Sequence, residues 1–358
     1  MGLFERDGAW TTARSLPAPS PCVRRPVSWR AVAAILLTAC APARAEGPTE
    51  PASAMPAPFI GPAFGTTYRV QCARLPAGRS RADLHRAIEE VLAGTDRAAS
   101  TWRADSDASR VGDAPADEWV PVAPDLVTLV EVARAIHDRS DGAFDITVAP
   151  LVAVWGGGPP RWRPAEAVVG PPADAAITAA LARVGMQHVE SRASQHPAGP
   201  ALRMRVSGMR LDLSGIAPGH AVDRIGTRLH ALGSTDHLVE LGGEVRAWGR
   251  RDDRTPWRVA VRTIDATVSR DVPLADGEAL AVSTVRPGQS PLDPRTGRPP
   301  THAARQVIVR ARSCAIADAW AVGCLVLGSG PSRERADAAE PDLLPLAVEF
   351  IPAADGPR

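Results

Sequence analysis

Apolar residues recur with helical spacing in several stretches of the chain. Leu84, Ile88, Val91 and Leu92 follow the three-to-four-residue spacing of one helix face, so residues 82–97 are predicted to form an amphipathic helix. A second stripe begins after Pro124 and ends before the turn at Gly142. A third runs over 222–232, behind the small-residue turn 214–219. The pattern therefore predicts at least three helices that each bury one face.

Shorter apolar or alternating stretches predict strands at 65–70, 238–241, 245–248, 257–261 and 307–309, with Gly242-Gly243 as a turn. These strand groups and the helices do not follow the regular βαβ rhythm of a doubly wound parallel sheet. The sequence favours an α+β fold, with mixed or antiparallel sheets and packed helices in one domain over residues 60–352.

One acidic residue interrupts the most apolar stretch of the chain. Asp318 lies within residues 315–327, where every neighbour is apolar or small. An ionised carboxylate buried without a partner costs several kcal/mol, so this position predicts a compensating cation or hydrogen-bond donor. Asp145 and Asp212 also stand between large apolar residues and close to glycine or other small residues. The three aspartates together suggest one site in which a hard cation meets a polyanionic ligand.

Composition adds few constraints on function. With 358 residues, of which 45% are hydrophobic, the chain can form a sizeable core. A net charge of +1 gives no indication of nucleic-acid binding, and we expect no nucleic-acid partner.

The first 45 residues have the pattern of an export signal. Arg24-Arg25 and Arg30 precede the apolar stretch 31–39, which is too short to span a bilayer stably. The stretch ends in Leu37-Thr38-Ala39-Cys40, which resembles a bacterial lipobox, whereas Ala43-Arg44-Ala45 offers ordinary signal-peptidase cleavage. We expect an exported, periplasmic protein, held at a bacterial membrane by a lipid on Cys40, with residues 46–59 as a Pro/Ala-rich tether. The remaining Cys72, Cys314 and Cys324 have no metal-ligand spacing and are predicted to be core thiols.

Seven short motifs occur in a fixed order along the domain: Phe64-Gly65-Thr66-Thr67, Ser100-Thr101-Trp102 with Asp105-Ser106, Gly142-Ala143-Phe144-Asp145 through Pro150-Leu151, Asp212-Leu213-Ser214-Gly215, Gly242-Gly243-Glu244, Asp293-Pro294-Arg295-Thr296-Gly297 and Ala317-Asp318. In this order they resemble the ApbE family. The resemblance implies an Mg²⁺-dependent FAD:protein FMN transferase. Such an enzyme cleaves the FAD pyrophosphate, attaches FMN to a Ser or Thr of an acceptor redox protein, and releases AMP. Phosphoryl transfer of this kind depends on positioning and on charge neutralisation.

The resemblance also assigns roles to individual residues. The positions that would contact FAD are Phe64, Trp102, Ala143, Phe144, Asp145, Asp212 and Leu292. Mg²⁺ would be bound by the Asp318 carboxylate and the Gly215 carbonyl, with Val322 at the third metal position. Catalytic residues are not assigned.

Several of these positions have a structural alternative. Asp318 could form a salt bridge with an arginine on a helix face, Asp145 could cap backbone amides in a turn, and Trp102 could be a core residue. The glycines at 65, 242 and 243 could serve only as turn residues, or could let backbone amides approach a phosphate.

Three positions depart from the family pattern. Pro218 replaces a lysine or acidic residue, Ser290 replaces a histidine that could assist proton transfer, and Val322 replaces a threonine, which removes a hydroxyl ligand. Transfer to a protein therefore has two alternatives: hydrolysis of FAD to FMN and AMP, or flavin binding without catalysis by a degenerate lipoprotein.

Overall fold

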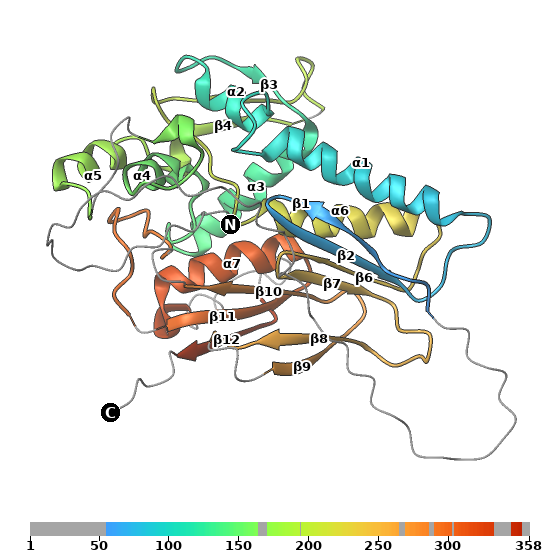
Figure 1. The fold of residues 1–358 in the computed structure, drawn as a ribbon. Coiled ribbons are helices and arrows are strands. Elements are labelled where there is room, and N and C mark those ends of the chain that lie inside the picture. The colour runs from blue at the N-terminus through green and yellow to red at the C-terminus, as the bar shows by residue number, and fades with distance from the viewer. Residues whose placement is uncertain are drawn as a thin grey trace, which may run out of the picture. The chain divides into compact units, whose positions relative to one another are not determined.

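The chain folds around an antiparallel sheet of seven strands in the order β1-β2-β6-β7-β10-β11-β12 (Figure 1). The computed structural model describes residues 55–163, 170–193, 195–264, 269–285, 290–302, 304–332 and 345–352, all of one folded unit. The predicted export segment 1–45 and the tether up to residue 54 lie outside the described residues. The strands are β1 (Phe59–Ala63), β2 (Thr66–Cys72), β6 (His237–Leu241), β7 (Glu244–Trp248), β10 (Ala279–Thr284), β11 (Ala304–Ala311) and β12 (Ala347–Pro352). The first strand begins at Phe59, one residue before the predicted start of the domain.

Alternating residues of the sheet pack against different layers. Val239 and Leu241 of β6 belong to the same core cluster as Ile225 and Leu229 of helix α6 (Ala217–Ala231). On β7, β10 and β11, the intervening residues pack instead against a separate hairpin of β8 (Trp257–Arg262) and β9 (Ser269–Leu274). The sheet is therefore covered by helices on one face and by this hairpin on the other, as the period of two along a strand requires (Figure 1).

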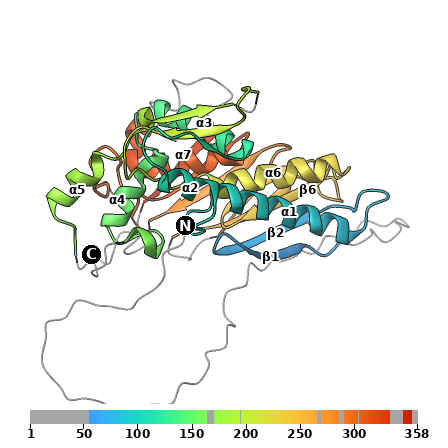
Figure 2. The same cartoon turned by 90° about the horizontal axis from the view of Figure 1, so that it is seen from above.

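Helices α6 and α7 (Cys314–Leu327) lie directly on the sheet, and α1 (Arg81–Ala99) packs on α6 (Figure 2). Helix α3 (Pro124–Arg139) contacts α7. Ser80 caps α1, with Asp83 completing the reciprocal capping box. The helices predicted at 82–97 and after Pro124 are confirmed, and the third begins at Ala217, inside the stretch predicted to be a turn.

The remaining elements form a second layer over α3 and α7. A three-stranded sheet in the order β3-β5-β4 contains β3 (Val120–Pro121), β5 (Ala201–Met204) and β4 (Val189–Arg192). Around it lie α2 (Asp107–Asp113), α4 (Ala149–Val154), α5 (Asp174–Leu181) and the 3-10 turns η1 (Ile146–Val148), η2 (Pro160–Trp162) and η3 (Met186–His188). The predicted α+β class, with antiparallel sheets and packed helices, is confirmed.

The cysteines and the hydropathy of the helices bear on two further predictions. Cys72, Cys314 and Cys324 are buried and free, as predicted for core thiols. Within the described ranges, no helix is both long and apolar enough to cross a membrane.

Candidate functional site

Asp318 lies in the first turns of α7 and is 4% exposed. The backbone N–H of Gly219, in α6, donates a hydrogen bond of 3.2 Å to its Oδ2 atom. No arginine forms an ion pair with this carboxylate in the described part of the chain, so the salt-bridge alternative is not found there. Burial is the main cause that raises the pKa of Asp318 to about 7. A cation bound beside this carboxylate would remove the cost of its burial.

Two contacts hold α6 against the start of α7. A Cβ atom on Gly219 would lie 2.4 Å from the carbonyl oxygen of Cys314, closer than any side chain can approach. Asp223, one turn further along α6, accepts hydrogen bonds from the backbone N–H groups of Cys314 and Ala315 at 2.9 and 3.1 Å. Arg246 pairs with Asp223 at 2.7 Å. Asp223 thus caps the N-terminus of α7 from a neighbouring helix and fixes the backbone next to Asp318.

Gly215, Val322 and Phe144 meet one turn further along α7. A Cβ atom on Gly215 would lie 2.9 Å from Cγ2 of Val322 and 3.5 Å from the Phe144 ring. Similarly, a Cβ atom on Gly323 would lie 3.4 Å from Cβ of Phe144. Three segments that are distant in the sequence therefore converge here. They contribute Gly215 and Val322, which are the two predicted metal positions other than Asp318, and Phe144, which is a predicted FAD contact.

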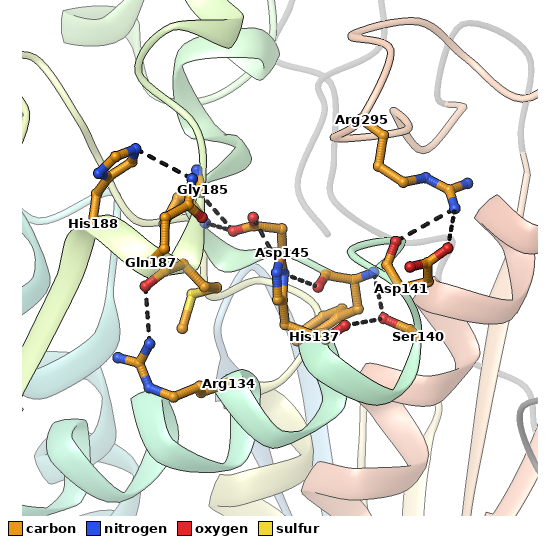
Figure 3. A network of polar contacts seen from close by, with 12 residues as sticks. Arg134, His137, Ser140, Asp141, Asp145, Gly185, Gln187, His188 and Arg295 are labelled. Carbon is orange, nitrogen blue, oxygen red and sulfur yellow. Dashed lines mark hydrogen bonds and ion pairs between the residues drawn. The ribbon is translucent and has the colours of Figure 1, made fainter. Parts of the chain in front are cut away.

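Asp145 is the centre of a buried polar network (Figure 3). Its Oδ1 atom accepts hydrogen bonds from the backbone N–H and the hydroxyl of Thr147, at 2.7 and 2.6 Å. Its Oδ2 atom lies 3.3 Å from Nδ1 of His137, which is also 3.2 Å from the carbonyl oxygen of Phe144. Only 2% of the Asp145 side chain is exposed. Burial raises the pKa of Asp145, and the Thr147 hydrogen bonds oppose that shift. The carboxylate thus caps the η1 turn, the alternative considered for it from the sequence.

Asp212 lies beside this turn. Its backbone N–H donates to the carbonyl oxygen of Ile146 at 2.6 Å, and its Oδ1 atom accepts from the N–H of Ser214 at 3.0 Å. The segment 212–215 is therefore attached to the segment that follows Asp145. Asp145 and Asp212, the other two aspartates flanked by apolar residues, therefore lie in neighbouring segments.

The turn at Phe64-Gly65 joins β1 to β2. Both residues have positive φ angles, 48° and 75°. In the neighbouring β6–β7 hairpin, Gly242 lies in the turn and Glu244 begins β7; a Cβ atom on Gly242 would lie 2.9 Å from the Thr66 side chain. Burial, followed by the Asp318 carboxylate, raises the pKa of Glu244 well above its ordinary value. Glu244 belongs to one of the motifs recognised in the sequence, which gave it no role.

Trp102 and Leu292 take no part in the contacts described above. Trp102 is 45% exposed, in the connection between α1 and α2, so it is not a core residue. Leu292 packs against the small cluster of Leu151, Ile177 and Ala180. The loop after Leu292 reaches the Asp141-Gly142 turn, because Arg295 lies 3.9 Å from Asp141 (Figure 3).

The three departures from the family pattern lie in different surroundings. Pro218 occupies the first turn of α6, Val322 faces Gly215, and Ser290 is partly exposed in the connection before Leu292. His220, next to Gly219, points to Asp125, with 4.0 Å between Nε2 and Oδ2. In this arrangement His220 interacts with the start of α3.

The described residues contain no group of three or more His, Cys, Asp or Glu side chains that could bind a metal. Mg²⁺ in nucleotide sites commonly uses one or two carboxylates together with substrate phosphates, and it does not need such a cluster. Asp318, with Glu244 nearby and the Gly215 backbone across α7, is compatible with that mode of binding.

Comparison with known proteins agrees with this geometry. The profile of the ApbE family matches residues 64–344. A protein named FAD:protein FMN transferase from Vibrio cholerae is 31% identical over 290 residues, covering 78% of this chain and 83% of its own length. The FAD:protein FMN transferase of Escherichia coli K12 is 30% identical, with 76% and 79% covered. The structure of the flavin transferase ApbE from Vibrio cholerae superimposes with a TM-score of 0.73 at 31% identity, covering 84% of this chain and 94% of that one. The apo flavinyl transferase ApbE of Pseudomonas stutzeri gives a TM-score of 0.69 at 34% identity, with 78% and 87% covered. On the order of its motifs, its fold and this match over most of its length, the chain belongs to the ApbE family.

Proposed function

We propose that this protein is an Mg²⁺-dependent FAD:protein FMN transferase. The observation that carries the proposal is that Gly215 and Phe144 converge on Val322, one helical turn after Asp318 in α7, in a chain that matches the ApbE family along most of its length. The named relatives carry the same activity in their names.

The proposed reaction transfers a phosphoryl group. The hydroxyl oxygen of a Ser or Thr in an acceptor redox protein forms a bond to the phosphorus of the FMN half of FAD. The bond from that phosphorus to the bridging oxygen breaks, AMP leaves, and the acceptor hydroxyl loses its proton to a base. A bound Mg²⁺ supplies charge neutralisation at the phosphates.

The chain's own residues orient the reactants in this proposal. Asp318 and the Gly215 carbonyl would hold the cation, and Glu244 adds a second carboxylate near Asp318. The backbone of residues 143–145, fixed by the buried Asp145 carboxylate, would form one wall of the flavin site. Val322 gives this cation no oxygen ligand, so we expect it to bind with fewer protein ligands.

The test is release of AMP from FAD by the purified soluble domain, with Mg²⁺ or with EDTA, and with or without an acceptor redox protein. The acceptor is then examined for covalently bound flavin fluorescence. We expect AMP release that requires Mg²⁺ and acceptor, together with a fluorescent acceptor. Asp318→Asn, which keeps the shape of the side chain, should abolish the Mg²⁺-dependent reaction.

The two alternatives give different outcomes in the same assay. AMP released without an acceptor identifies a hydrolase, in which water takes the place of the Ser or Thr hydroxyl. Saturable FAD binding without AMP release identifies a flavin-binding protein that has lost catalysis, as the changes at Ser290 and Val322 would allow.

We also propose export and lipid attachment at Cys40, on the strength of the lipobox-like residues 37–40. Metabolic labelling with a radioactive fatty acid in a bacterial host should mark the parent protein and leave Cys40→Ala unlabelled. Label on both proteins would exclude Cys40 as the attachment site.

A further inference from the structure

The connection between α1 and α2 carries the exposed Trp102 and has almost no regular structure. A side chain from a distant part of the chain, that of Arg161 in the η2 turn, binds it. The Arg161 guanidinium donates hydrogen bonds to the carbonyl oxygens of Thr101, Trp102 and Arg103, the latter two at 3.1 and 3.3 Å. A planar guanidinium with five donors in fixed directions is suited to bind several carbonyls at once.

Arg161 also joins this connection to α2. Its Nη2 atom lies 2.7 Å from the hydroxyl of Ser109, which in turn donates to the carbonyl oxygen of Arg103 at 2.5 Å. Ser106 caps α2 and donates to the carbonyl oxygen of Ser100 at 2.5 Å. The backbone on both sides of Trp102 is thus tied into one hydrogen-bonded unit, with Arg161 at its centre.

The same unit contacts the segment that leads to Asp212. A Cβ atom on Gly112, in α2, would lie 3.3 Å from the side chain of Arg210, two residues before Asp212. Arg210 forms an ion pair with Asp113 at 2.5 Å, and both residues act electrostatically on Arg161. Arg161 forms no ion pair with any carboxylate in the described residues. Its hydrogen bonds go to carbonyls and a hydroxyl, so the side chain is engaged in holding backbone.

We propose that Arg161 is a positioning residue for the flavin site. It holds the connection of residues 100–106 so that the Trp102 indole is presented to the isoalloxazine ring of FAD. This inference rests on the proposed function, because it needs FAD as the ligand. A flat indole offers a large apolar face for such a ring, and its contribution depends on the backbone that orients it.

The experiment measures FAD affinity by isothermal titration in the presence of Mg²⁺, for single and double variants. We expect Arg161→Ala to weaken FAD binding about tenfold, as the loss of hydrogen bonds from a charged group would do. Trp102→Ala should weaken binding by a similar factor. The double variant should be no weaker than Trp102→Ala alone, because Arg161 acts through Trp102. Arg161→Lys should lie between the parent and Arg161→Ala, since an ammonium can satisfy fewer of the carbonyls.

The matched control is Arg163→Ala, two residues away, because the Arg163 guanidinium donates its hydrogen bonds to the carbonyl oxygen of the nearby Gly158. The FAD affinity of Arg163→Ala should stay within twofold of that of the parent protein. Ser109→Ala removes one of the four Arg161 partners, and it gives a milder test should Arg161→Ala fail to fold; we expect about twofold weaker binding.

Four results would overturn the inference, and they separate it from the proposed function. Unchanged affinity in Arg161→Ala, or multiplied effects in the double variant, would show that Arg161 does not act through Trp102. Unchanged affinity in Trp102→Ala would remove the indole from the site. In all three cases the transferase proposal stands if AMP release still requires Mg²⁺ and acceptor. A parent protein that binds no FAD overturns both proposals together.

Discussion

At Gly219 helix α6 approaches the backbone of α7 so closely that the position should tolerate no side chain. In Gly219→Ala the new Cβ atom would lie 2.4 Å from the Cys314 carbonyl oxygen, 2.7 Å from its carbonyl carbon and 2.9 Å from the Cα atom of Ala315. Ordinary contacts begin at 3.4 Å, so the clash amounts to 1.0 Å. All three atoms belong to the backbone, and a side-chain rotation cannot relieve the overlap. Overpacking of this kind commonly costs about 1–3 kcal/mol, and we expect Gly219→Ala at the upper end, about 3 kcal/mol.

The assay is equilibrium unfolding in urea, followed by circular dichroism. Gly94→Ala is the matched control, because Gly94 also lies inside a helix, and its new Cβ atom would meet only the Arg97 guanidinium at 4.0 Å. There the substitution should stabilise the protein by about 0.5–1 kcal/mol, since alanine is the better helix former. If Gly219→Ala unfolds at the same urea concentration as the parent while Gly94→Ala is stabilised, the close contact between the helices is refuted.

Three further predictions concern Asp318, Asp145 and Val322. Because burial raises the pKa of Asp318 from 3.8 to about 7, the folded state binds this proton more tightly than the unfolded state does. In EDTA, stability should therefore fall as pH rises from about 4 to about 7; Asp318→Asn should flatten this part of a stability-pH curve, and an unchanged slope would contradict the assignment. Asp145→Ala should destabilise the protein by about 3 kcal/mol, because the buried N–H and hydroxyl of Thr147 lose their acceptor, and should weaken FAD binding. The exposed pair at Asp105 gives the control, since Asp105→Ala should leave the unfolding free energy close to that of the parent, and equal effects of the two variants would rule out a special role for the buried carboxylate. Val322→Thr places a hydroxyl opposite Gly215 in nearly the same volume and should lower the Mg²⁺ concentration needed for half-maximal AMP release; a higher requirement would argue against a metal at this position.

The sequence predicted the long elements well, because their hydrophobic faces have a clear period. The stripes of α1 and α3 and the strands around Gly242-Gly243 are found where they were expected. The short elements α2, α4 and α5 were missed, since six to eight residues carry too few apolar positions to define a period. The start of α6 was misplaced, because Pro218 and Gly219 indicate a turn in sequence terms, although proline is well tolerated in the first turn of a helix.

For the site, the sequence allowed Asp318 to be recognised, but it did not reveal the contacts that the site residues make. Asp318 was recognisable as a buried carboxylate because every neighbour is apolar, and its burial is confirmed. The inward direction of the Asp145 carboxylate depends on His137 and Thr147 folding around it, which no spacing in the sequence reveals. Arg161 gave no signal at all, since its partners lie 52 to 60 residues away and are mostly backbone carbonyls.

The contacts that bring the segments of the site together are made by glycines. Gly215 and Gly219 each bring backbone within a distance that excludes a side chain or forces its neighbour to give way, and Gly323 brings α7 into van der Waals range of Phe144. Of the departures from the family pattern, Val322 lies opposite Gly215, whereas Ser290 takes no part in these contacts. The backbone contacts that build the scaffold and the side chains that serve the chemistry therefore overlap only in part. A lineage can exchange a ligand or a base by one codon change while the scaffold stays intact, and the same scaffold offers an engineer single-residue routes back to the family's full set of functional groups.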